Sequence, residues 1–203
     1  TKNETRDVAR AESLKTSEKE ESMEICFVPD KDYKRFLIDG AGVQKHQGEI
    51  VDLFGRVLGH HDGIEFYTIG QRRGIGISSS KPLYVVDIDA ENNRVIVGGE
   101  EALEREEFFV ERCNWIPFDN PPTEVRGRVH IRYNHPGIDG TIFPQPDGSA
   151  RIQLDTPARA VTPGQACVFY DGDVVLGGGW ITRTTNPALK SAAEKKEMDP
   201  ALT

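Results

Sequence analysis

Long apolar runs and an N-terminal export signal are both missing from this sequence. No stretch of apolar residues approaches the roughly 18 that a membrane-spanning helix needs, and the first residues hold neither a basic segment nor an apolar one of the secretory kind. We therefore expect a cytoplasmic protein with no membrane partner. The chain still has 203 residues, 37% of them hydrophobic, which is enough for a buried core in one or two domains.

Cysteine is scarce. The sequence has three cysteines: Cys26, Cys113 and Cys167. They lie far apart without a Cys-x-x-Cys pair, which excludes the usual zinc ribbon, and they are too few for a disulfide framework. Adjacent His60 and His61 precede Asp62, but no third ligand follows at helical or hairpin spacing. We expect no metal site.

A surplus of positive charge is lacking as well. The chain has 25 Lys and Arg against 33 Asp and Glu, a formal net charge of -8, whereas phosphate binding depends on basic side chains. Residues 123–183 differ, because there the two signs balance and every basic residue is an arginine: Arg126, Arg128, Arg132, Arg151, Arg159 and Arg183. The planar guanidinium fork suits phosphates and base edges. Ordinary solvated surface charge is the alternative that composition leaves open.

The apolar pattern predicts short helices at the N-terminal side and strands beyond. Residues 1–14 have the spacing of an amphipathic helix, and Asp30 is a candidate cap for a helix over 31–38. From Gly48 onward, apolar residues flank turn residues in two hairpin-like pairs, at 50–58 and at 83–97. In the second pair, the Asn residues of the turn tolerate the positive φ that a tight turn needs.

Six further strands are predicted at roughly ten-residue spacing, with no helix between them: 107–115, 125–133, 138–143, 150–154, 165–170 and 174–181. The expected fold is mainly β, a small central β domain followed by a six-stranded antiparallel β-barrel, with short N-terminal helices. The boundaries that we expect are 1–39, 40–104 and 105–182, with a flexible tail over 183–203.

The cysteines differ in their surroundings. Cys113 and Cys167 lie in apolar strands, where a buried core thiol is the usual explanation. Cys26 lies at a loop-to-helix junction, where a thiolate can be exposed and stabilised by a helix N-terminus. Spacing alone leaves open a buried structural thiol and a nucleophile at this position.

Several blocks, in order, resemble one family. Residues 19–28 (KEESMEICFV) resemble the second-cysteine motif of the tRNA-specific 2-thiouridylases, the MnmA/TrmU family. Residues 61–63 (HDG) and 67–77 (YTIGQRRGIGI) resemble its central-domain signature. The segments 129–133, 159–173 and 176–179 are similar to its C-terminal barrel. The resemblance covers about residues 1–182.

The resemblance implies ATP-dependent sulfur transfer to the wobble uridine of certain tRNAs. In that family, ATP adenylates the uridine carbonyl oxygen, and a cysteine persulfide, loaded by a sulfur-donor protein, delivers sulfur to the activated carbon. The matching cysteine is Cys26. The family's adenylating domain, with its Ser-Gly-Gly-Val-Asp-Ser loop and its other catalytic cysteine, is not in this sequence. We therefore expect a fragment that does not catalyse the reaction alone, with residues 1–39 as the tail of that domain and its linker helix.

The resemblance also implies tRNA contacts in the barrel, at Arg132, Tyr133 and Gln165. Arg can bind phosphate or stack on a base, Tyr offers a flat ring, and Gln can donate and accept at a base edge. The structural alternative makes Tyr133 a core residue at the barrel rim and Arg132 a solvated charge. Two other functions are open: a noncatalytic RNA- or protein-binding barrel adaptor, and a redox-sensing thiol protein.

Overall fold

The computed structural model describes residues 2–15, 17–18, 28, 33–40, 42, 44–133, 135–184 and 186–198. The chain divides into two compact units, Thr1–Lys45 and His46–Thr203. Among the described residues, no helix combines the length and the apolar character that crossing a bilayer requires.

The first unit contains short helices, as predicted. α1 spans Lys2–Ala11, and α2, Tyr33–Arg35, continues into a π-helical turn at Phe36–Gly40. Near the end of α1, the Arg10 guanidinium donates to Asp7 at 2.8 Å and to Glu18 at 2.7 Å. Exposed pairs of this kind contribute little to stability. The apolar side chain of Val8 is exposed on this unit.

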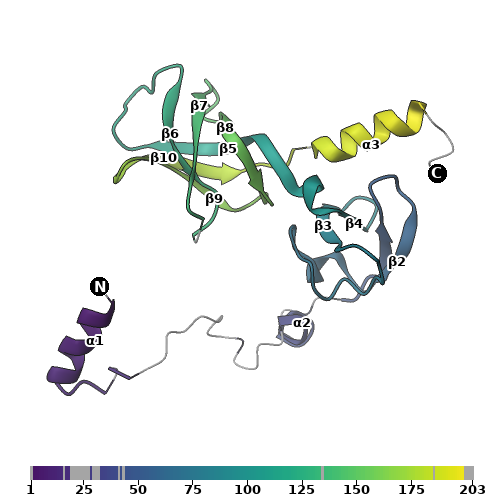
Figure 1. Ribbon diagram of the computed structural model, residues 1–203, viewed down its shortest axis with the longest axis horizontal. Helices are drawn as coiled ribbons and strands as arrows, with labels where there is room; N and C mark the ends of the chain where they lie inside the picture. The colour runs from purple at the N-terminus through teal and green to yellow at the C-terminus, as the bar shows by residue number, and fades with distance from the viewer. Residues whose placement is uncertain are drawn as a thin grey trace. The chain divides into compact units, whose positions relative to one another are not determined.

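A four-stranded sheet opens the second unit (Figure 1). Its strands are β1 (Gly48–Val51), β2 (Val57–His61), β3 (Tyr84–Asp89) and β4 (Arg94–Gly98), in the order β2-β1-β4-β3. Both predicted hairpins are confirmed, and Asn93 in the second turn has a φ of 51°. The sequence did not reveal that β1 and β4 pair in parallel, which joins the two hairpins into one sheet.

The long segment between β2 and β3 covers this sheet. It includes the 3₁₀ turn η2 (Ile64–Phe66), and Ile75 from its glycine-rich part is buried with the sheet residues Ile50, Val85 and Val95. At the edge of β3, Gly70 donates its N–H to the Val85 carbonyl at 2.8 Å, and Val85 donates to the Gln71 carbonyl at 2.9 Å. These bonds occupy backbone groups that an edge strand otherwise leaves unpaired.

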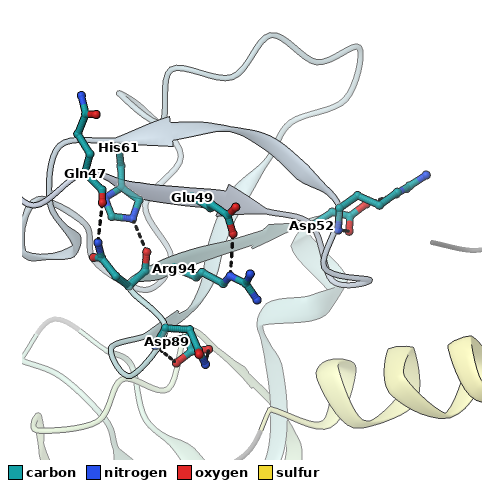
Figure 2. A network of polar contacts seen from close by, with 9 residues as sticks. Gln47, Glu49, Asp52, His61, Asp89 and Arg94 are labelled. Carbon is teal, nitrogen blue, oxygen red and sulfur yellow. Dashed lines mark hydrogen bonds and ion pairs between the residues drawn. The ribbon is translucent and has the colours of Figure 1, made fainter.

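His61 is held at the end of the sheet by two hydrogen bonds. Its Nε2 atom lies 3.2 Å from the Asn93 carbonyl oxygen, and the Gly63 N–H donates to its Nδ1 atom at 3.1 Å. Figure 2 shows this ring beside Gln47, whose carbonyl oxygen accepts a bond from the Asn93 side chain at 2.8 Å. The two bonds to the ring together require the neutral form with its proton on Nε2. Burial lowers the pKa of His61, although the bond to Asn93 and the nearby Glu65 and Asp62 partly oppose this.

Two charged pairs lie on the same sheet. Arg94 of β4 donates to Glu49 of β1 at 2.9 Å, directly across the parallel pair (Figure 2). Arg56 donates to Asp52 at 2.7 Å across the β1–β2 turn. The Asp52 carboxylate also accepts hydrogen bonds from the backbone N–H groups of Phe54 and Arg56, and these bonds stabilise the β1–β2 turn. Asx turns of this kind explain why acidic residues fit hairpin loops.

The six predicted barrel strands are confirmed. A 3₁₀ turn, η3 (Glu100–Leu103), leads into β5 (Glu104–Trp115), β6 (Val125–His130), β7 (Ile138–Pro144), β8 (Ala150–Arg159), β9 (Ala166–Asp171) and β10 (Val174–Ile181). They close in the order β10-β5-β8-β7-β6-β9. Alternate residues fill the interior, where Phe108, Ile142, Ile152 and Phe169 are fully buried.

Three consecutive glycines allow β10 to close the barrel. A Cβ atom on Gly179 would lie 2.6 Å from the Glu111 carbonyl oxygen of β5. On Gly177 and Gly178 it would approach the carbonyl oxygens of Asn114 and Cys167 even more closely. Any larger side chain would push β10 away from one of its two partners.

An apolar cluster links the sheet to the barrel within this unit. Tyr84 and Val86 of β3 pack with Ala102 and Leu103 of η3 and with Ala160, which follows β8. The Arg159 guanidinium lies 4.7 Å from the centre of the Tyr84 ring. Beyond β10, Arg183 donates to the Asp87 carboxylate at 2.9 Å.

Within the segment 183–203, where the sequence predicted a tail without regular structure, residues Pro187–Met198 form helix α3. The Asn186 side chain accepts the Ala188 N–H at 2.8 Å and caps the helix, and Pro187 suits the first helical position. The Asn186 amide also donates to the Ala102 carbonyl at 3.2 Å, and Ala192 is buried. Because the segment is rich in Ala, Lys and Glu rather than in large apolar residues, hydrophobic periodicity could not reveal it.

The stability of the second unit should decrease as the pH falls from 7.5 to 5.5. The pKa of His61 is lower in the folded chain than the ordinary value near 6.5, so the unfolded chain binds the proton more tightly. The stabilisation by neutral His61 is complete above the ordinary pKa of about 6.5, and it is lost as the pH falls through the lower pKa of the folded chain. Urea unfolding at both pH values should show a smaller change for His61→Gln than for the natural chain, with the variant already less stable at pH 7.5.

A variant of His135 can be compared with the His61 variant, because the pKa of His135 is also lowered in the folded chain. The variant His135→Gln should remove part of the same pH dependence without weakening the sheet. An equal loss of stability on acidification in the natural chain and in both variants would contradict this explanation.

Candidate functional site

Cys26, the predicted nucleophile, lies outside the described residues. The other two cysteines are free thiols within the barrel wall. Burial raises the pKa of Cys113 to about 11 and raises that of Cys167 even further, since Cys167 is fully buried. A thiol that stays protonated near pH 7 is a poor nucleophile. The prediction that both are core residues holds for Cys167, whereas Cys113 is half-buried against the core.

The residues that the structure describes contain no group of three His, Cys, Asp or Glu placed to hold a metal ion. The adjacent pair at 60 and 61 does not form one because neighbouring residues of a strand point to opposite faces. His60 is exposed, whereas His61 is buried and uses both ring nitrogens in hydrogen bonds.

The glycine-rich segment 67–77 is an ordered loop with no helix after it, so it is not a dinucleotide-binding turn. The Gln71 side chain accepts the Thr68 N–H at 3.1 Å and donates to the Arg73 carbonyl at 2.9 Å, which fixes the bend. Arg72 and Arg73 are exposed on it.

Arg132 and Tyr133 lie directly after β6, on the way to β7. Ile131 is buried and anchors the segment, and the Arg132 carbonyl accepts the His135 N–H at 3.1 Å. The Tyr133 side chain is 98% exposed. The alternative that Tyr133 is a core residue at the rim is therefore wrong, and its ring is available to a partner.

Two histidines that the sequence analysis did not select surround Arg132. The His130 ring meets Tyr170 of β9 edge to face, with ring centres 5.0 Å apart. His135 accepts the Gly137 N–H on Nδ1 at 3.1 Å. The pKa of His135 is lowered first by partial burial and then by the charges of Arg132 and His130, so these three groups share one small region. Isolated histidines give no sequence signal for such a cluster.

Gln165 lies at the same end of the barrel as Arg132. In the antiparallel pair β6–β9, His130 is opposite Val168, so residues just after β6 and just before β9 come together. The Gln165 side chain is exposed, while its backbone is fixed, since Gln165 donates to the Thr162 carbonyl at 3.3 Å and accepts the Ile181 N–H at 2.9 Å. The fold thus gathers Arg132, Tyr133 and Gln165 on one rim.

Arg132 differs electrostatically from the other arginines of residues 123–183. Five of the six form ion pairs: Arg126 with Asp155, Arg128 with Asp139, Arg151 with Glu107, Arg159 with Glu100, and Arg183 with Asp87. Arg132 is exposed, and no carboxylate in the described part of the chain lies within ion-pairing distance of it. An unpaired, exposed guanidinium beside an exposed aromatic ring is suited to a polyanion with flat bases.

Two family models match this chain, one over the region of the four-stranded sheet and one over the barrel. A family model described as a tRNA methyl transferase PRC-barrel domain matches residues 34–99. A second model, described as an aminomethyltransferase beta-barrel domain, matches residues 105–181.

Curated relatives are similar across both domains. A tRNA-specific 2-thiouridylase MnmA 1 from Thermoanaerobacter sp. (strain X514) is 48% identical over 182 residues, which is 90% of this chain and 50% of the relative. The proteins named tRNA-specific 2-thiouridylase MnmA from Geotalea uraniireducens and Chloroflexus aggregans are each 47% identical. These matches cover 92% and 90% of this chain and 49% and 51% of the relatives. The chain spans about half the length of the curated relatives it matches.

The burial of the two barrel thiols predicts their reactivity. In the folded chain at pH 7.5, a brief pulse of iodoacetamide should leave Cys113 and Cys167 unmodified, because neither forms a thiolate at that pH. Peptide mapping by mass spectrometry measures each site separately. The same pulse in 8 M urea should label all cysteines and serves as the control. Rapid labelling of Cys167 in the folded chain would show that it is not enclosed.

Proposed function

Because the chain belongs to the tRNA-specific 2-thiouridylase family, we propose that it is the C-terminal part of an ATP-dependent sulfurtransferase that forms 2-thiouridine at the wobble position of tRNA. The observation that carries this proposal is the match to relatives of that name over 90% of the chain. That match runs through the sheet and the barrel together, whereas the methyl-transfer names of the two family models each concern one domain. Sulfur transfer therefore has the better support.

In the proposed enzyme, this chain supplies a sulfur carrier and part of the tRNA-binding surface. ATP would be bound by an adenylating domain that is not in this sequence, and it would turn the uridine carbonyl oxygen into a leaving group. A sulfur-donor protein would load Cys26 with its outer sulfur. The two barrel thiols support this assignment indirectly, because burial raises the pKa of both Cys113 and Cys167 and makes them poor sulfur carriers near pH 7.

The transfer step that we propose uses Cys26 as a persulfide. Its outer sulfur attacks the activated uridine carbon, and the bond from that carbon to the adenylated oxygen breaks, so that AMP leaves. A thiolate from a second cysteine in the adenylating domain then attacks the Cys26 sulfur. The bond between Cys26 and the transferred sulfur breaks, 2-thiouridine is released and a disulfide forms. Reduction of that disulfide by a cellular thiol returns both cysteines to the starting state.

The rim formed by Arg132, Tyr133 and Gln165 is the proposed tRNA contact. Arg132 has its charge available, Tyr133 presents nearly its whole side chain, and Gln165 extends an amide from a backbone that is fixed by hydrogen bonds. Together these groups can neutralise a phosphate, stack on a base and bond to a base edge. The neighbouring His130 and His135 add further flat rings to the same region.

Catalysis provides the first test. Incubated with tRNA, ATP and a sulfur donor, this chain alone should form no 2-thiouridine, because in this proposal ATP is bound by the adenylating domain. In the enzyme that includes the adenylating domain, Cys26→Ser should reduce thiolation by several orders of magnitude while tRNA binding persists, since a hydroxyl cannot carry a second sulfur. Nucleoside analysis by mass spectrometry measures the product. Cys113→Ser is the matched control and should retain activity. Turnover by Cys26→Ser at the natural rate would exclude the persulfide role.

Binding provides the second test. For the chain and unmodified tRNA, Arg132→Ala should weaken binding and reduce the slope of log Kd against log salt concentration by about one, because one phosphate contact is lost. Gln165→Ala should weaken binding without changing the slope, since an amide releases no counterion.

Two controls separate the rim from general surface charge. Arg126→Ala removes an arginine that is already paired with Asp155, and Gln145→Ala removes an exposed amide elsewhere on the barrel. Both should bind nearly as the natural chain does. If Arg132→Ala and Gln165→Ala also retain the natural affinity and salt slope with folding intact, the rim is not a tRNA contact.

A further inference from the structure

Trp180 presents its ring on the outside of the barrel, beside the rim just described. The chain has two tryptophans. Trp115 packs against the core through Phe118 and Phe169, whereas the Trp180 side chain is 45% exposed. A tryptophan normally buries most of its area, so an exposed indole on a rigid strand is a candidate contact for a partner.

The strand beside Trp180 is distorted in a way that directs an arginine toward it. Glu111 lies opposite Trp180 and Asn114 opposite Gly178, so Arg112 and Cys113 both face Gly179, which defines a β-bulge. Arg112 adopts a φ of 50°, a conformation that costs energy for a residue with a side chain. Its side chain is 73% exposed, and its guanidinium lies 5.9 Å from the centre of the Trp180 ring.

Trp180 and Arg112 border a surface hollow on the barrel. The hollow is also lined by Pro163 and Gly164, next to Gln165, and its volume of about 510 Å³ is within the range of small-ligand pockets. Gly164 donates its N–H to the Ile181 carbonyl at 2.8 Å, and Ile181 donates to the Gln165 carbonyl at 2.9 Å. These backbone bonds hold the turn at Gly164 and Gln165 against the end of β10.

Strand register brings Trp180 and the segment after β6 to the same end of the barrel. Trp180 of β10 is opposite Ala166 of β9, and His130, the last residue of β6, is opposite Val168 of β9. Trp180, the small Ala166 and Arg132 are all exposed. A flat ring and an unpaired guanidinium therefore lie at the same end of the barrel, and the residue opposite the ring is small.

We propose that Trp180 and Arg112 form a second part of the tRNA-binding surface, in which the indole stacks on a nucleotide and Arg112 contacts a phosphate. This inference rests on the proposed function and extends the rim by one strand. The exposed Glu111 oxygen, 3.7 Å from Arg112, forms only a weak pair and leaves other guanidinium N–H groups free to donate. The residues around the Trp180 ring are small, which favours a nucleic-acid strand as the partner. A protein partner would require a broader apolar surface.

The experiment uses the 203-residue chain and unmodified tRNA. Trp180→Leu should weaken binding about tenfold without changing the salt slope, and Trp180→Phe should recover most of the loss because it keeps a flat ring. Arg112→Ala should reduce the salt slope by about one. Val174→Ala, an exposed substitution at the other end of β10, is the control.

Fluorescence gives an independent readout. Binding should quench the emission of the natural chain through stacking on the exposed indole, and Trp180→Phe, which retains only Trp115, should lose most of that quenching. A natural affinity for both Trp180→Leu and Arg112→Ala, while Arg132→Ala is weakened, would overturn this inference and leave the rim in place. A natural chain that does not bind tRNA would overturn the tRNA-binding part of the proposed function as well.

Discussion

The approach of β10 to both of its neighbours is the constraint on which the second unit depends. The backbone of Gly177 to Gly179 lies against carbonyl oxygens of β5 on one side and β9 on the other, where no Cβ atom fits. That closeness allows the barrel to close, and it coincides with the bulge in β5, where two residues face Gly179. It also fixes the turn that carries Gln165, which bonds to the end of β10. A packing requirement in the wall thus sets the positions of side chains on the outer surface.

The arginines of the barrel differ in whether they are paired with a carboxylate. Most arginines of the barrel form an ion pair with a carboxylate on a neighbouring strand or loop. Their charges therefore contribute to contacts between strands and are not free. Arg132 lies beyond the last paired position of β6 and keeps its charge exposed. A chain with a net charge of -8 can still bind an anion at such a place, because the local potential near a single unpaired guanidinium differs from the average over the surface.

The sequence predicted the strands well because the signals that define them are local. Alternating apolar residues and turn residues located both hairpins and all six barrel strands, and Asn93 adopts the positive φ that its turn was expected to need. The parallel pairing of β1 with β4 was missed because nothing within either strand encodes a partner that lies 45 residues away. Helix α3 was missed because a cap and a buried amide hold it rather than an apolar stripe.

Prediction of the site was limited for a different reason. Arg132, Tyr133 and Gln165 were selected by resemblance, and the structure adds that they share a rim and that Tyr133 is not part of the core. His130, His135 and Trp180 carry no signal in the sequence, because strand register alone makes them neighbours of that rim.

The pairing of β5 with β10 has a further consequence for synthesis on the ribosome. β5 is made first among the barrel strands and β10 last, so the edge of β5 must wait as an open template until residue 181 emerges, and during that interval a chaperone or a neighbouring nascent chain competes with β10 for it.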